Sequence, residues 1–146
     1  MENLIIHGGI SITGDRSCSD NKISDSLSNI IEESFFKLQG SSSKSSVLNA
    51  IKMLEDNPIF NAGTGSKLQM DKQIRMSAAL MDGSKNIFSG VVNVQNIKNP
   101  IEAAEILSLE EHSILCGEQA TDYCRKKGMI EYDPVTAERI NEYENN

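Results

Sequence analysis

Hydrophobic positions in the first third of the chain repeat with the period of an α-helix. After residue 24 they recur three or four positions apart, at Leu27, Ile30, Ile31, Phe35 and Leu38. This spacing predicts a helix that Ser24 or Asp25 caps and Gly40 ends. A second helix is predicted over residues 45–53, where apolar residues again follow the helical period. The serine-rich run 41–46 is then a short turn whose last serines cap the second helix.

Short continuous apolar runs predict strands. Residues 4–6 are expected to form a buried strand that ends in a sharp turn at two glycines. Residues 78–81 and 89–94 are small and apolar on successive positions, as in strands covered on both faces. Residues 82–84 supply the turn between them, and residues 67–75 suit a hairpin turn.

Two further helices are predicted nearer the C-terminus. Residues 99–102 have the sequence Asn-Pro-Ile-Glu, with an Asn cap, proline at the first position and Glu completing a capping box. Residues 116–127 end in basic residues followed by Gly128, as helices often do. From Glu131 the chain is charged, and its last dozen residues are expected to be a frayed helix or disordered. The resulting order of elements predicts a mixed α/β (α+β) layered fold with too few strands for a complete sandwich.

Composition excludes several classes of protein. The net charge of −7 argues against nucleic acid as a partner. No apolar run is long enough to span a bilayer, and the N-terminus lacks the features of a signal peptide, so we expect a cytoplasmic protein without membrane association. The three cysteines, Cys18, Cys116 and Cys124, are odd in number and lack CxxC spacing, which disfavours a disulfide framework or a zinc site. Cys116 and Cys124 are expected to be packing residues.

The most informative segment is the run from residue 54 to 66. Pro58 ends the preceding helix, and Gly63 and Gly65 permit backbone angles that other residues resist. Phe60 gives the loop an apolar anchor, which is unusual for a simple connector. A loop curled around proline and glycine turns carbonyl oxygens inward, and hard cations bind such oxygens. The alternative is a loop held by its own hydrogen bonds without an ion.

No complete catalytic set can be assembled from the residues alone. His7 follows a predicted strand and is a candidate catalytic residue, although a lone histidine in that position is more often structural. His112 has no visible partner and is also expected to be structural. The run 63–67 lacks the spacing of a phosphate-binding loop and follows a helix, not a strand. No serine elbow or metal-ligand spacing is present.

Several blocks of the sequence, taken together, resemble the plant-type asparaginases, the isoaspartyl peptidase/asparaginase branch of the N-terminal-nucleophile hydrolases. The blocks follow the order of that family and comprise residues 5–9, 54–66, 76–83, 97–101, His112 and 117–118. They cover most of residues 4–128. The chain departs from the family pattern at Ile10, Ser77 and Gln119.

The resemblance implies that this chain is half of a four-layer αββα sandwich, completed by a second chain. Residues 1–130 would form the α-chain half, and residues 131–146 a charged tail leading toward a self-cleavage site. The β chain of the same precursor would begin with Thr, acting as nucleophile and, through its α-amine, as general base. Two such αβ units would form a dimer. The implied activity is hydrolysis of β-aspartyl dipeptides and asparagine.

Other functions remain open at this point. Within the family, the alternatives are a glycosylasparaginase, whose usual secretory signal is missing, and a threonine-type endopeptidase, which normally carries insertions. Outside it, the alternative is a non-catalytic interaction domain that retains the scaffold.

The resemblance also implies two sets of site residues. In the family, main-chain oxygens of the loop bind sodium, and the corresponding residues here are Leu54, Glu55, Asn57, Phe60, Ala62 and Thr64. No other cofactor is implied. Asn61 and the turn formed by His7, Gly8 and Gly9 are expected to lie near the nucleophile, where the Asn61 amide would donate a hydrogen bond that supports self-cleavage. The alternative is that Asn61 only ties the loop to itself.

Overall fold

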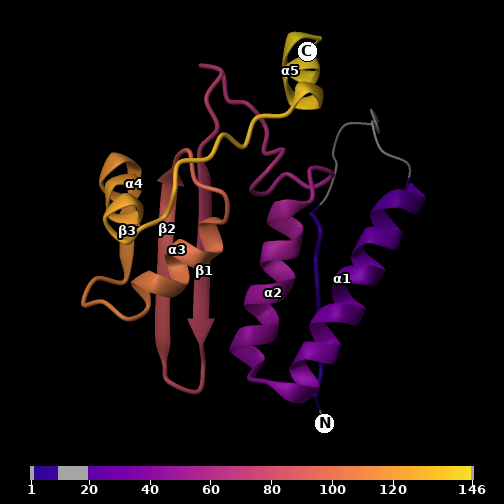
Figure 1. The fold of residues 1–146 in the computed structure, drawn as a ribbon, viewed down its shortest axis with the longest axis vertical. Coiled ribbons are helices and arrows are strands. Elements are labelled where there is room, and N and C mark those ends of the chain that lie inside the picture. Colours follow the sequence, from indigo (N-terminus) through magenta and orange to yellow (C-terminus); the bar gives the residue numbers. More distant parts are fainter. Residues whose placement is uncertain (1, 10–19, 146) are drawn as a thin grey trace. The chain divides into compact units, whose positions relative to one another are not determined.

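The computed structural model describes residues 2–9 and 20–145, and the side chain of Asp20 is not described. This part of the chain forms five helices and three strands: α1 (Asp20–Gly40), α2 (Ser43–Asp56), β1 (Met76–Asp82), β2 (Ile87–Val94), α3 (Pro100–Leu107), β3 (Ile114–Cys116), α4 (Gly117–Lys126) and α5 (Ala137–Glu144) (Figure 1). The predicted mixed α+β class is confirmed. The chain divides into two compact units, Met1–Leu54 and Glu55–Asn146, which are described separately.

The first unit contains α1 and most of α2. Helix α1 begins at Asp20 and not at Ser24 or Asp25, because Ile23 extends the apolar stripe by one turn and is partly buried. Its end at Gly40 is as predicted. The two helices are joined by a buried hydrogen bond of 2.5 Å from Ser46 Oγ to the Ser34 carbonyl. The serine run does supply the cap of α2, but the last serines do not: the helix already begins at Ser43, and Ser42 Oγ accepts from the backbone of Ser45.

The strand predicted at residues 4–6 is wrong for this structure. Residues 2–9 have no regular secondary structure, and the side chain of Ile5 is 92% exposed. A strand needs a neighbouring backbone to complete its hydrogen bonds. Within the described residues, the sheet comprises only β1, β2 and β3.

The second unit is built on that sheet. Strands β1 and β2 form an antiparallel hairpin, and β3 lies parallel to β2 on its other side. The predicted turn is present, since Asp82 Oδ1 accepts a 3.0 Å hydrogen bond from the Ser84 backbone. The register shifts between Met76 and Ala78. There the side chain of Ser77, one of the departures from the family pattern, accepts a hydrogen bond from the Asn93 backbone.

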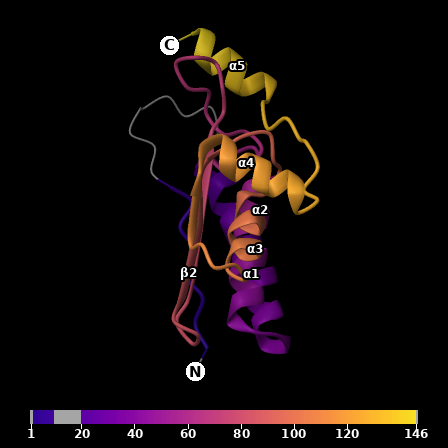
Figure 2. The same cartoon turned by 90° about the vertical axis from the view of Figure 1, so that its left-hand side faces the viewer.

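Helices α3 and α4 lie on the same side of the sheet (Figure 2). The core between them is aliphatic and includes Met76, Val91, Val94, Ile97, Leu107 and Cys124. The opposite face carries exposed apolar side chains, with Met81 70% and Phe88 48% exposed. The prediction of strands covered on both faces is therefore wrong for this chain, because burial alternates along β1 and helices cover one face only.

Of two smaller expectations, that for the cysteines is correct only for Cys124, and that for the last dozen residues is decided in favour of a helix. Cys124 is buried in the core as predicted, but Cys116 is exposed at the end of β3, because it precedes α4 and does not belong to its buried stripe. The C-terminal segment forms α5, whose first turn is capped by Thr136 Oγ1 accepting from the Arg139 backbone. None of the helices in the described residues has the length and apolar character needed to cross a membrane.

Candidate functional site

The loop after α2 turns back sharply on itself. Helix α2 ends at Asp56, two residues before Pro58, as predicted. The side chain of Asn57 accepts a hydrogen bond from the Ile59 backbone, and its carbonyl accepts one from Phe60 at 3.1 Å. The Phe60 side chain is only 5% exposed, so it anchors the turn. We call residues 57–67 the curled loop.

Two glycines allow the curled loop to close. Gly63 has φ +54°, and a Cβ at this position would lie 2.3 Å from the Glu55 carbonyl oxygen. Gly65 has φ +82°, and its Cβ would lie 2.7 Å from the Pro58 carbonyl oxygen. The closure is held by a 2.7 Å hydrogen bond from the Thr64 backbone to the Glu55 carbonyl. The prediction that this loop needs both glycines is confirmed by these close approaches.

Glu55 is a buried carboxyl group at the base of the curled loop. Its Oε1 accepts a 3.0 Å hydrogen bond from the backbone of Ile101, in the first turn of α3. Burial raises the pKa of Glu55 to about 7, although the hydrogen bond from the Ile101 backbone and the nearby Asn99 amide oppose this increase. Its Oε2 has no hydrogen-bond partner among the described residues.

The predicted side-chain cap of α3 is therefore only partly correct. Asn99 is the N-cap residue and Pro100 follows it, but the Asn99 side chain makes no capping bond. It donates instead to Asp56 Oδ1 at 3.0 Å. The helix start is capped by Glu55 from α2, a residue 46 positions away that local sequence patterns do not reveal.

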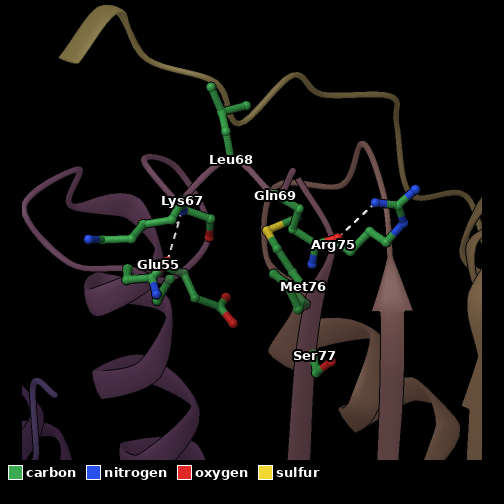
Figure 3. Close-up of a pocket in the computed structure, with 12 residues that line it drawn as sticks. Glu55, Lys67, Leu68, Gln69, Arg75, Met76 and Ser77 are labelled. Carbon is green, nitrogen blue, oxygen red and sulfur yellow. Dashed lines mark hydrogen bonds between the residues drawn. The ribbon is translucent and has the colours of Figure 1, made fainter. Parts of the chain in front are cut away.

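A pocket of about 340 Å³ lies between the curled loop and the start of β1 (Figure 3). Its lining includes Glu55, Asn61, Lys67, Arg75, Met76 and Ser77. Figure 3 shows the Glu55 carboxyl directed away from its helix toward the strand that carries Met76. The cationic side chain of Arg75 is already paired with Gln69 and Asp71. The pocket is thus polar, with one incompletely satisfied buried acceptor.

Asn61 lies at the edge of this pocket and is exposed. Its Oδ1 accepts a 2.8 Å hydrogen bond from the backbone of Lys67, so the residue does tie the loop to itself. Its NH₂ group makes no hydrogen bond to the described residues. An amide held by its oxygen presents its two N–H donors in a fixed direction, so both alternatives for Asn61 are compatible with this geometry.

The six predicted sodium ligands all lie between the last turn of α2 and the end of the curled loop. The Glu55 and Asn57 carbonyls each already accept a backbone hydrogen bond, which leaves a second lone pair on each oxygen. In the part of the chain that the structure describes, no three His, Cys, Asp or Glu side chains are grouped to hold a metal ion. Sodium binding by the main-chain oxygens of these six residues stays a prediction.

The histidine turn belongs to the other unit. His7 is exposed, and Gly9 has φ +93°, a conformation that favours glycine. Gly8 is partly buried. The proximity of this turn to Asn61 stays a prediction. His112 is exposed in the connection between α3 and β3.

The C-terminal segment contributes contacts that sequence analysis missed. Tyr132 hydroxyl lies 2.9 Å from Thr64 Oγ1, and the Pro134 carbonyl accepts a 2.8 Å hydrogen bond from the Gly65 backbone. Arg139 donates to the Gly65 carbonyl. The opposite charges of Arg139 and Glu142, three residues apart, are visible in the sequence, but their partners in the loop are not.

Comparisons with known proteins identify the family of this chain. A family model described as asparaginase matches residues 1–146. The chain belongs to the asparaginase family. An isoaspartyl peptidase/L-asparaginase of Synechocystis sp. is 44% identical to this family member over 141 residues, 96% of this chain and 43% of that protein. A plant-type L-asparaginase of Thermococcus kodakarensis is 37% identical over 145 residues, 99% of this chain and 47% of its own length. The chain thus spans less than half the length of these curated relatives.

Proposed function

We propose that this asparaginase-family chain is the α subunit of a self-processing isoaspartyl peptidase/L-asparaginase. The observation that carries the proposal is the match of almost the whole chain to relatives with these names, over less than half of their length. The rest of the protein would be the β chain of the same precursor. The Oγ of its N-terminal Thr would attack the β-aspartyl carbonyl while its α-amine takes the hydroxyl proton. That proton would pass to the leaving amine as the C–N bond breaks, which releases ammonia from asparagine or the second amino acid from a dipeptide and leaves an acyl-enzyme. Water would then release aspartate from the acyl-enzyme.

The uncovered face of the sheet supports the proposal of a partner chain. Met81, Phe88 and Val92 are exposed on β1 and β2, opposite the face that α3 and α4 cover. Exposed apolar surface of this kind marks an interaction site. A second sheet, supplied by the β chain, would cover this face and give the four-layer αββα sandwich, and two αβ units would then assemble as a dimer.

In this proposal, Asn61 supports self-cleavage. Its Oδ1 is held by the Lys67 backbone, so its NH₂ group can donate to the oxyanion that develops on the carbonyl of the scissile peptide, directly before the Thr. The backbone of His7, Gly8 and Gly9 would approach the same nucleophile. Sodium would be held by the six main-chain oxygens named above, and it would stabilise the curved backbone that carries Asn61.

The test uses the full-length protein that contains these residues. Self-cleavage should yield two chains on a denaturing gel, and mass spectrometry of the second should give an N-terminal Thr. The processed protein should release aspartate from a β-aspartyl dipeptide and from asparagine. Asn61→Ala should slow cleavage markedly while leaving the folded assembly intact. An uncleaved, inactive protein would overturn the proposal in favour of a non-catalytic scaffold.

A further inference from the structure

The C-terminal segment binds the curled loop along most of its second half. We define the tail as residues 132–145. Its contacts reach three residues of the loop: Tyr132 contacts Thr64, Pro134 and Arg139 contact Gly65, and Glu142 contacts Lys67. Each contact joins residues at least 68 positions apart in sequence. The loop therefore does not take its shape from its own sequence alone.

Arg139 is the centre of these contacts. Its side chain is only 11% exposed, which is low for an arginine on a short terminal helix. The Nε atom donates to the Gly65 carbonyl, and Nη1 donates to Glu142 Oε2 at 2.6 Å. The other oxygen of Glu142 is 2.6 Å from Lys67 Nζ. A planar guanidinium can serve two acceptors at once in this way, whereas an ammonium is a single point charge.

The network reaches Asn61 through Lys67. The side chain of Lys67 pairs with Glu142, and its backbone N–H holds Asn61 Oδ1 at 2.8 Å. Gly65 lies two residues before Lys67, and its carbonyl is fixed by Arg139. Both ends of this short segment are thus tied to α5. A shift of Gly65 or Lys67 would rotate the Asn61 amide, since its oxygen follows the Lys67 backbone.

We propose that Arg139 is a positioning residue for the reaction, holding the curled loop, directly at Gly65 and through Glu142 at Lys67, so that the Asn61 amide points at the reacting carbonyl. This inference rests on the proposed function and extends it to the tail. In the proposed precursor the tail also leads to the scissile bond, so one side chain would align both the cleaved segment and the amide that supports cleavage. Arg139 touches neither substrate nor nucleophile in this arrangement.

The test compares variants of the full-length precursor. Arg139→Met keeps an apolar stem but removes the donors, and it should slow self-cleavage about tenfold, the effect of losing a charged hydrogen bond. Arg139→Lys keeps the charge beside Glu142 and should recover part of the rate. Glu142→Gln should slow cleavage about threefold, as expected for a partly exposed ion pair. Its matched control is Glu144→Gln, an exposed carboxylate on the same helix, which should cleave at the wild-type rate.

A control for stability is also needed. Val135 in the tail packs against the hydrophobic core, so Val135→Ala should lower the Tm without slowing cleavage. In the processed protein, Arg139→Met should lower kcat for a β-aspartyl dipeptide and leave KM within about twofold, because the Asn61 amide that Arg139 positions acts on the reacting carbonyl and not on substrate binding.

The outcomes separate this proposal from the proposed function. If the wild-type precursor cleaves itself and Arg139→Met cleaves at the same rate, the role of Arg139 alone is overturned. The same holds if Arg139→Met and Val135→Ala lose the same Tm and their cleavage is slowed by the same factor. If Arg139→Met does not fold, equal rates for Glu142→Gln and Glu144→Gln would overturn it. A wild-type protein that neither cleaves nor hydrolyses the dipeptide would overturn both proposals.

Discussion

Replacement of Gly63 by alanine tests the closed shape of the curled loop most directly. The residue has φ +54°, and an added Cβ would lie 2.3 Å from the Glu55 carbonyl oxygen and 2.6 Å from its Cβ. Real Cβ atoms essentially never approach within 3.0 Å, so the backbone of α2 or of the loop has to move. The movement would break the hydrogen bond from Thr64 to Glu55.

The expected cost is the sum of three effects. A non-glycine residue in the left-handed region costs about 1–2 kcal/mol. Overpacking of a tight site costs about 1–3 kcal/mol. Loss of one backbone hydrogen bond adds about 1 kcal/mol. Gly63→Ala should therefore lower the free energy of unfolding by about 3–6 kcal/mol, a large part of the total stability of a typical protein.

Gly117→Ala is the matched control. Gly117 has φ +65°, close to that of Gly63, but no described atom lies within 4 Å of its added Cβ. The free energy of unfolding of this variant should fall only by the conformational cost of about 1–2 kcal/mol. Urea unfolding of the full-length proteins at one protein concentration measures both changes. Equal losses in the two variants would refute the claim that the Glu55 carbonyl blocks a side chain at residue 63.

Three further outcomes are expected. Residues 1–146 expressed alone should aggregate and bind a hydrophobic dye through Met81 and Phe88, whereas a cooperative monomeric melt would contradict the half-sandwich. Replacing sodium by choline should lower the Tm of the full-length protein, and an unchanged Tm would count against the sodium site. Lys67 and Arg139 lower the pKa of Glu142 below 4.5, so its contribution to stability is present above pH 4.5 and is lost as the pH falls through the folded pKa. The difference in Tm between wild type and Glu142→Gln should therefore shrink in acid, and a constant difference would refute this.

Local sequence patterns predicted the elements whose cause is local. The helical period gave α1 and α2, and the Asn-Pro pair gave the start of α3. The strand predicted at residues 4–6 was wrong because a strand depends on a neighbouring backbone, and the sheet of the described residues comprises only β1, β2 and β3. The apolar residues of β1 and β2 predicted strands with both faces covered, whereas the helices of this chain cover only one face of the sheet. The pattern indicates which surface needs burial, but not which chain buries it.

The candidate site shows a similar division. Pro58, Phe60 and the two glycines predicted a curled loop, and their backbone angles and close contacts agree. The charged tail gave no such signal, because its residues suit solvent as well as a packed helix end. Arg139 is partly buried only because carbonyl and carboxylate acceptors from the loop and from its own helix meet its guanidinium. Such pairing over long sequence distances has no local periodicity to detect.

The geometry of the curled loop depends on Glu55, which is part of the family motif, and also on residues outside that motif. The Glu55 carbonyl accepts a hydrogen bond from the Thr64 backbone and so closes the curled loop, while its side chain caps α3. The desolvation that raises its pKa to about 7 works against an ionised carboxyl group, whereas the positive end of α3 favours one. Glu55 thus joins the loop to α3, and the tail holds the loop at Gly65. A change in the tail can consequently alter the site while every motif residue is retained.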